Sequence, residues 1–178
     1  MEGWLPQRKT LRLRHYDYAQ AGMYFVTVCT HHRASVLGSI VDGEMHPSEL
    51  GCTVEDCWSA LPTLHVGVAL DEFVVMPNHF HGIVALAQPE PGSMNRAPTL
   101  GEVVRAFKAR CSQAFRRGAI YRARNAPLWQ RGYYEHVIRD ENDLDRIREY
   151  IANNPLQWGL DRNNPVWDGR DESRPYGL

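Results

Sequence analysis

Two histidines on either side of one bulky apolar residue, His79-Phe80-His81, are the residues best suited to metal chemistry. The apolar runs at residues 73–76 and 83–86 flank them, and both are short and β-branched enough to be strands. Because side chains alternate along a strand, the two imidazoles share one face and Phe80 anchors the other face in the core. Such a pair can bind one divalent metal ion. A polar face on a half-buried strand would show the same pattern.

A second group of candidates lies on a helix expected at residues 141–153, which Asp140 caps and Pro155 ends. An apolar stripe along this helix is expected to dock it on a sheet, and it consists of Leu144, Ile147 and Ile151. Tyr150 and Asn154 are four residues apart and therefore share a face beside that stripe. A tyrosine that packs at the helix edge and an asparagine that ends the helix are the structural alternative.

The elements around these residues predict an α+β fold in a single domain, with a mainly antiparallel sheet and helices on one side of it. Strands are expected at residues 23–30, 66–76, 79–86 and 133–138, a loose hairpin at 31–48, and helices at 49–61, 99–117 and 141–153. Ser48 is the expected cap of the first helix, and Pro62 is expected to stop it. We divide the chain into a basic N-terminal arm (1–20), the domain (21–160) and an irregular tail (161–178).

Composition excludes several classes of protein. The chain has 178 residues, 43% of them apolar, and no long uncharged apolar run, so we expect one globular domain and no membrane span. The N-terminus has no apolar signal core, which indicates a cytoplasmic protein. The four cysteines form no C-x-x-C pair, and reduced thiols are expected in place of disulfides or a zinc site.

The net charge of −1 does not by itself suggest a nucleic-acid-binding protein, but the basic residues are clustered. One cluster lies in the N-terminal arm and the other around the helix at 99–117. The candidate phosphate contacts are Arg8, Lys9, Arg12, Arg14, Arg105, Lys108 and Arg131. A solvated helix face is the common alternative for such a run of charges.

Four motifs in order carry a resemblance to a known family. They are His79-Phe80-His81, Trp129-Gln130-Arg131, the segment 133–139, and the helix motif in which Tyr150-Ile151 precedes Asn154-Pro155. Together they resemble the single-tyrosine HUH transposases, and more narrowly the REP-associated tyrosine transposases. The resemblance runs from about residue 16 to residue 160, and it implies the ferredoxin-like, HUH-type form of the α+β fold.

The resemblance implies an activity and a site. Members of the family cut and rejoin single-stranded DNA next to hairpins, through a 5′-phosphotyrosine that leaves a free 3′-OH. Carried over by position, Tyr150 is the nucleophile, and His79, His81 and Asn154 hold Mg²⁺ or Mn²⁺. The implied partner is single-stranded DNA with hairpins, bound by a monomer or a homodimer.

Alternatives to this reading stay open. Tyr133 and Tyr134 are rival nucleophiles, although neither has a candidate ligand four residues later. A domesticated protein that binds hairpin DNA or RNA without cutting is a second class. A metal-dependent phosphodiesterase that uses water in place of tyrosine is a third. A covalent protein–DNA adduct separates the transposase from both of the others.

Overall fold

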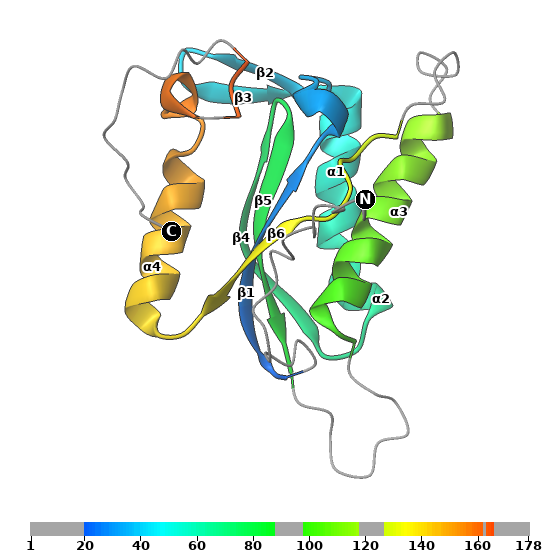
Figure 1. Cartoon of the computed structure of the whole chain (residues 1–178), viewed down its shortest axis with the longest axis vertical. Coiled ribbons are helices and arrows are strands. Elements are labelled where there is room, and N and C mark those ends of the chain that lie inside the picture. Colours follow the sequence, from blue (N-terminus) through cyan, green and yellow to red (C-terminus); the bar gives the residue numbers. More distant parts are fainter. Residues whose placement is uncertain (1–19, 88–97, 118–126, 162, 166–178) are drawn as a thin grey trace, which may run out of the picture.

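A four-stranded sheet forms the centre of the protein (Figure 1), in the order β4-β5-β1-β6. Its strands are β1 (Gly22–Cys29), β4 (Val68–Met76), β5 (His79–Leu86) and β6 (Tyr134–Ile138). All three pairings are antiparallel. The structure is a computed structural model that describes residues 20–87, 98–117, 127–161 and 163–165. It confirms the α+β class and the mainly antiparallel sheet expected from the sequence.

A separate two-stranded hairpin, β2 (Gly38–Val41) with β3 (Glu44–Pro47), follows the short 3-10 helix η1 (His31–Arg33). Its turn is made by Asp42 and Gly43, whose φ angles of 51° and 80° lie in the left-handed region. Asp-Gly suits a two-residue hairpin because its backbone twist there matches that of the strands. The hairpin expected within residues 31–48 is therefore present.

Three helices cover one face of the sheet: α1 (Glu49–Ser59), α2 (Leu61–Leu64) and α3 (Leu100–Arg117). Ser48 caps α1 as expected, because its side chain accepts a hydrogen bond from the backbone N–H of Gly51. The expected end of this helix at Pro62 is wrong. The helix ends at Ser59, and Pro62 lies in the first turn of α2. A proline is tolerated there because the backbone N–H groups of a first turn have no partner within the helix.

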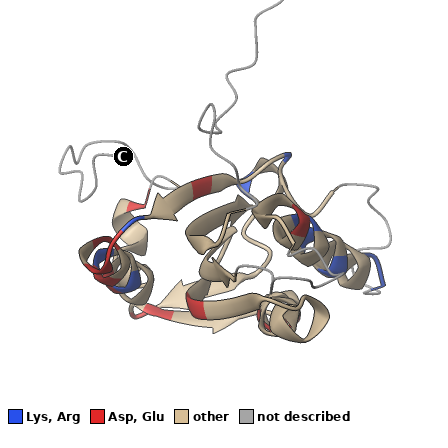
Figure 2. Cartoon of the chain, turned by 90° about the horizontal axis from the view of Figure 1, so that it is seen from below, with Lys and Arg blue, Asp and Glu red and all other residues tan. Residues whose placement is uncertain are grey.

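The last helix, α4 (Glu141–Asn153), covers the opposite face of the sheet, so the expectation of helices on one side only is wrong. Figure 2 shows the sheet between α4 on one side and α1 and α3 on the other. The reason lies in the central strands. Phe25 and Ile83 are apolar residues on the face opposite the α1–α3 core, and the predicted stripe of α4 buries them. A sheet that is apolar on both faces needs two covering layers.

Several predictions fall on residues 1–19, 88–97, 118–126, 162 and 166–178, outside the described residues. These include the basic arm and most of the tail. Within the part of the chain that the structure describes, no helix is both long and apolar enough for a membrane span.

Candidate metal and nucleophile site

The histidine pair lies at the start of β5, where the strand leaves the turn formed by Pro77 and Asn78. Both imidazoles are buried, with exposed fractions of 0% for His79 and 3% for His81, and their ring centroids are 4.5 Å apart. They point to the α4 face, while Phe80 packs against Trp58 on the other face. This alternation confirms the geometry expected from the sequence.

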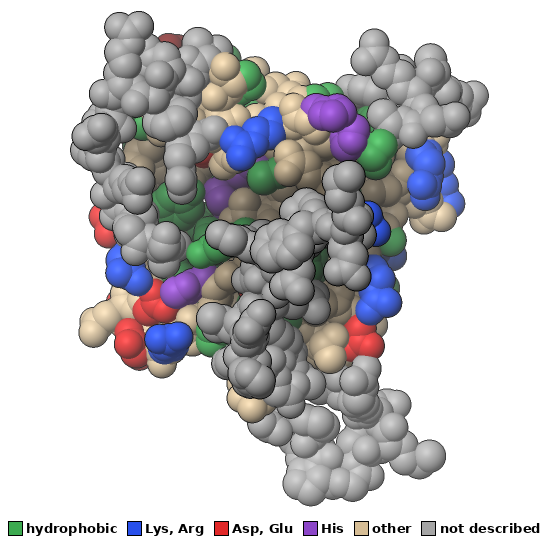
Figure 3. Space-filling model, in the orientation of Figure 1, with side chains coloured by type: hydrophobic (Ala, Val, Ile, Leu, Met, Phe, Trp, Pro, Cys, Tyr) green, Lys and Arg blue, Asp and Glu red, His purple; other side chains and the backbone are tan. Residues whose placement is uncertain are grey.

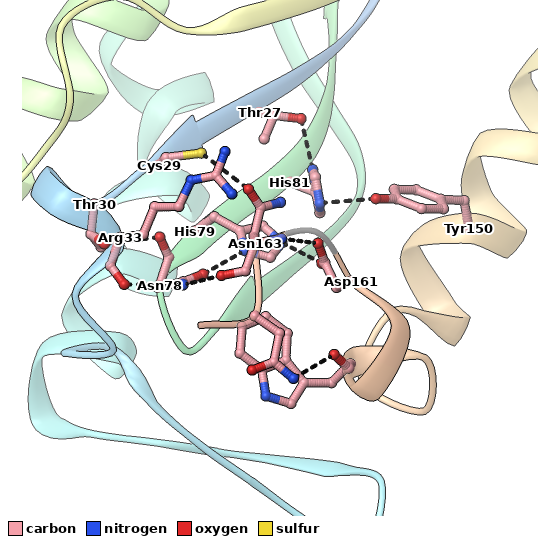
Figure 4. A network of polar contacts seen from close by, with 12 residues as sticks. Thr27, Cys29, Thr30, Arg33, Asn78, His79, His81, Tyr150, Asp161 and Asn163 are labelled. Atoms are coloured by element: carbon pink, nitrogen blue, oxygen red, sulfur yellow. Dashed lines mark hydrogen bonds and ion pairs between the residues drawn. The ribbon is translucent and has the colours of Figure 1, made fainter. Parts of the chain in front are cut away.

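Asn78 fixes the orientation of the His79 ring (Figure 4). Its Nδ2 donates to the backbone carbonyls of Arg33 and Asn163, at 3.1 and 2.6 Å. The amide oxygen of Asn78 therefore faces Nδ1 of His79, at 2.9 Å. Because that oxygen only accepts hydrogen bonds, Nδ1 of His79 carries the hydrogen and Nε2 presents a lone pair. This is the arrangement that a metal-binding histidine needs.

His81 is oriented by β1, the neighbouring strand. Thr27 lies directly opposite it in the sheet, and the Thr27 hydroxyl is 2.8 Å from Nδ1 of His81. Phe25 stacks on the same ring, with centroids 5.2 Å apart. The hydroxyl can accept the Nδ1 hydrogen, which leaves Nε2 of His81 with its lone pair toward α4.

Burial keeps both imidazoles neutral. It lowers the pKa of His79 to about 4, against the opposite effects of Asp161 and Asn154, while the nearby charge of Arg33 lowers it further. Burial also lowers the pKa of His81 well below its usual value. Neutral imidazoles near pH 7 are the form that binds metal ions.

Tyr150 reaches this site from α4. Its hydroxyl is 3.3 Å from Nε2 of His81, and its ring packs edge-on against Phe25 with centroids 6.0 Å apart. The apolar stripe of α4 docks on the sheet through Phe25, Ile83 and Ile138, as the spacing of that stripe predicts. The structure thus brings together the predicted nucleophile and the predicted histidine pair.

Asn154, one helical turn after Tyr150, is the C-cap of α4 and is 3% exposed. Its Oδ1 is buried and has no hydrogen-bond partner among the described residues. A buried amide oxygen without a partner costs free energy, on the order of 1–3 kcal/mol. The residue therefore lies at the site as expected, in a state that suits an additional ligand.

The sequence did not point to Asp161. It follows the short 3-10 helix η3 (Trp158–Leu160), in the segment expected to be an irregular tail. One carboxylate oxygen lies 3.5 Å from Nε2 of His79. The candidate ligand atoms of His79, His81 and Asp161 all lie within 4.8 Å of one another. Its position depends on long-range contacts, and no local pattern in the sequence marks it.

An ion pair links α4 to the edge strand of the sheet. Arg148 donates from Nε and Nη2 to the two carboxylate oxygens of Asp71, at 2.8 and 2.7 Å. This bond is the main reason that the pKa of Asp71 is lowered. Asp71 lies at an irregularity in the pairing of β4 with β5, between Leu70 and Phe73. The pair therefore joins α4, the helix that carries Tyr150, to the edge strand.

The basic candidates that the structure describes lie away from the histidine pair, on and near α3. Arg105 and Arg131 are exposed, and Figure 3 shows Lys and Arg side chains along the edge of the molecule formed by α3. Lys108 donates to the backbone carbonyls of Gln130 and Gly132, at 2.7 and 2.6 Å, so its ammonium is partly engaged within the protein. Arg105, Lys108 and Tyr133 line an open groove of about 400 Å³. Arg8, Lys9, Arg12 and Arg14 lie outside the described residues.

The rival tyrosines, Tyr133 and Tyr134, and the nearby His136 lie on or beside β6. Tyr134 is opposite Thr27 in the sheet and is 38% exposed, so it shares the histidine face but lies two strands from His81. Tyr133 packs against the α3 side of the core. His136 is bonded to Asp143 of α4, at 2.8 Å. Tyr134 and His136 therefore both lie on the face that carries the candidate metal ligands, whereas Tyr133 lies on the other.

Comparisons with known proteins identify the family of this chain. Residues 20–154 match the family described as "Transposase IS200 like". Because the match covers most of the chain, the protein belongs to the IS200-like transposase family. This confirms the resemblance to the single-tyrosine transposases.

Two relatives and one solved structure are similar to most of this chain. The chain is 37% identical over 170 residues to an uncharacterized protein of Haemophilus influenzae, with 87% of this chain and 92% of the relative covered. It is 26% identical over 145 residues to another protein of that organism, named "Putative REP-associated tyrosine transposase", with 80% and 75% covered. A solved REP-associated tyrosine transposase bound to a REP hairpin has the same fold. Its TM-score is 0.58 at 22% identity, with 84% of this chain and 75% of that chain covered.

Proposed function

We propose that this protein is a metal-dependent transposase that cuts and rejoins single-stranded DNA next to a hairpin, through a 5′-phosphotyrosine at Tyr150. The observation that carries the proposal is the 3.3 Å distance between the Tyr150 hydroxyl and Nε2 of His81. That distance would place a phenol oxygen beside a phosphate held at the histidine pair. The relative bound to a REP hairpin supports the choice of hairpin DNA.

In this proposal, His79, His81 and Asn154 hold Mg²⁺ or Mn²⁺. The residues fit such a cation, since Nε2 of His79 and Oδ1 of Asn154 are buried and have no hydrogen-bond partner among the described residues. The bound cation would neutralise charge on the phosphate oxygens. The phenol needs this help because its ordinary pKa is ~10, so that little phenolate exists near pH 7.

The proposed step forms one bond to phosphorus and breaks another. The oxygen of Tyr150 bonds to phosphorus while the bond from phosphorus to the 3′ oxygen breaks. The phenol loses its proton, and the 3′ oxygen gains one to become a 3′-OH. The 5′ phosphate stays on Tyr150 as a diester, so a later attack by a 3′-OH can rejoin DNA without ATP.

The experiment that tests the proposal uses single strands of the host genome that carry a hairpin with unpaired flanks. Incubation with the protein and Mg²⁺ or Mn²⁺, followed by a denaturing gel, should show a cut strand and a slower protein–DNA adduct. A cut strand without an adduct would favour the phosphodiesterase that uses water. Binding with neither product would favour the domesticated binding protein.

The form of the substrate gives a separate prediction. We expect the protein to bind a hairpin with single-stranded flanks more tightly than a blunt duplex of the same sequence. The affinity should fall about tenfold or more between ~50 and ~200 mM salt, because Lys and Arg contacts to phosphates release counterions. A gel shift at each salt concentration measures both effects. Equal affinity for the two DNA forms would contradict the preference.

The ion pair between Arg148 and Asp71 also makes a prediction. Arg148→Ala should lower the cleavage rate about tenfold, because a misplacement of Tyr150 by a fraction of an ångström is costly. It should change thermal stability little, since the Arg148 side chain is 39% exposed and solvent screens the ion pair. Single-turnover cleavage and thermal denaturation measure the two quantities.

Arg146→Ala is the matched control, because Arg146 forms an ion pair with Asp143 inside the same helix. Exchange of the charges in a double variant, Asp71→Arg with Arg148→Asp, should restore part of the rate. If Arg148→Ala and Arg146→Ala cleave at the same rate, the ion pair does not position Tyr150.

A further inference from the structure

Asp161 belongs neither to the sheet nor to α4, but its side chain lies at the histidine site. It directly follows η3, whose Trp158 ring lies with its centroid 6.0 Å from that of His79. The Asp161 side chain is 11% exposed, and its Oδ2 is buried and has no hydrogen-bond partner among the described residues. A buried carboxylate oxygen in this state requires a partner of positive charge.

The other carboxylate oxygen is held in place. Oδ1 of Asp161 accepts a hydrogen bond of 2.7 Å from the backbone N–H of Asn163. The carbonyl of Asn163 in turn accepts from Nδ2 of Asn78, the residue that orients the His79 ring. One set of contacts therefore directs both Oδ2 of Asp161 and Nε2 of His79 toward the same space (Figure 4).

The atoms that meet there are all acceptors. Nε2 of His79 presents its lone pair, because Nδ1 carries the hydrogen that Asn78 accepts. It faces a carboxylate oxygen at 3.5 Å, and the amide oxygen of Asn154 is buried and without a partner as well. Acceptors that face one another repel unless a proton or a cation lies between them.

The separation of these atoms fits a shared metal ion. Two ligand atoms that are each about 2.1 Å from one ion lie about 3–3.5 Å apart at angles of about 90–110°. The 3.5 Å between Asp161 and His79 is close to this range, and the candidate ligand atoms of His79, His81 and Asp161 all lie within 4.8 Å of one another. Small side-chain rotations would suffice to bring them onto one ion.

We propose that Asp161 is a metal ligand, so that the site is built from two histidines and one carboxylate, with Asn154 beside them. This inference rests on the proposed metal-dependent function and extends it. Two imidazoles alone accept Zn²⁺ well, whereas an added carboxylate favours harder cations such as Mn²⁺ and Mg²⁺. The segment after α4 would thereby belong to the metal site.

The test measures metal binding directly, on the full chain and without DNA. Isothermal titration with Mn²⁺ should show at least tenfold weaker binding for Asp161→Asn than for the wild type. Asparagine keeps an acceptor for the N–H of Asn163 but removes the negative charge. Zn²⁺ affinity should fall less than Mn²⁺ affinity, because the imidazoles remain.

Asp56→Asn is the matched control, since Asp56 is an exposed carboxylate on α1 that lies outside the site. Thermal denaturation in EDTA checks that each variant is folded, and Asp161→Ala serves as a second variant. Unchanged Mn²⁺ affinity in the folded Asp161 variants would overturn the role of Asp161 alone. A wild-type chain that binds no Mn²⁺ would contradict the metal-dependent function itself.

Discussion

Replacement of Tyr150 by phenylalanine is expected to abolish both strand cleavage and the covalent protein–DNA adduct. The change removes the tyrosine hydroxyl that lies 3.3 Å from Nε2 of His81. Loss of a nucleophile typically costs at least about 10³-fold in rate. Hairpin affinity should change little, because DNA affinity comes mainly from contacts to phosphates and bases. The loss of one hydrogen bond should cost about 1 kcal/mol of stability or less.

Tyr134→Phe is a demanding control, because Tyr134 shares the histidine face of the sheet and is partly exposed. Tyr133→Phe controls for the tyrosine on the α3 side. Both variants should retain cleavage and the adduct. Peptide mapping of the wild-type adduct gives an independent answer. DNA on the peptide with Tyr133 and Tyr134, and none on the peptide with Tyr150, would show that the nucleophile is misassigned.

The face shared by the two histidines could be predicted because it depends on local geometry alone. Alternation along one strand places His79 and His81 together and Phe80 opposite, whatever the rest of the fold is. The docking surface of α4 followed in the same way, from the helical spacing of its apolar stripe. The structure agrees with both predictions, since Phe80 packs against Phe107 and the stripe packs against Phe25 and Ile83.

The side of the sheet that α4 covers could not be predicted, because it depends on pairings between distant strands. The hydrogen bond between Thr27 and His81 has the same origin, since it requires the register of β1 with β5. The apolar residues of β1 by themselves predict only a strand. Apolar residues that follow one another along that strand lie on both of its faces, and they are the signal in the sequence for a second covering layer.

Asp161 was missed for a different reason. The residues around it have neither helical nor strand periodicity, and they are rich in turn-forming types. One of the contacts around it, the hydrogen bond from Asn78 to the carbonyl of Asn163, joins residues that are 85 positions apart. A single sequence carries no sign of such a contact.

Replacement of both histidines, His79→Ala with His81→Ala, is expected to abolish divalent metal binding and metal-dependent cleavage. The wild type should be stabilised by about 2.7 kcal/mol when Mn²⁺ is present at one hundred times its Kd, because only the folded chain presents the site. The double variant should show no such gain. Thermal denaturation with Mn²⁺ and with EDTA measures this difference without DNA and without turnover.

The double variant should also lose stability in EDTA, on the order of 2–5 kcal/mol for each buried ring removed, because alanine leaves a cavity. The comparison with and without Mn²⁺ within one variant separates this loss from the loss of metal binding. His46→Ala with His65→Ala is the control, since neither histidine lies at the site. That variant should keep the full Mn²⁺ stabilisation. A His79 and His81 variant that is stabilised by Mn²⁺ and cleaves as well as the wild type would show that the ion binds elsewhere.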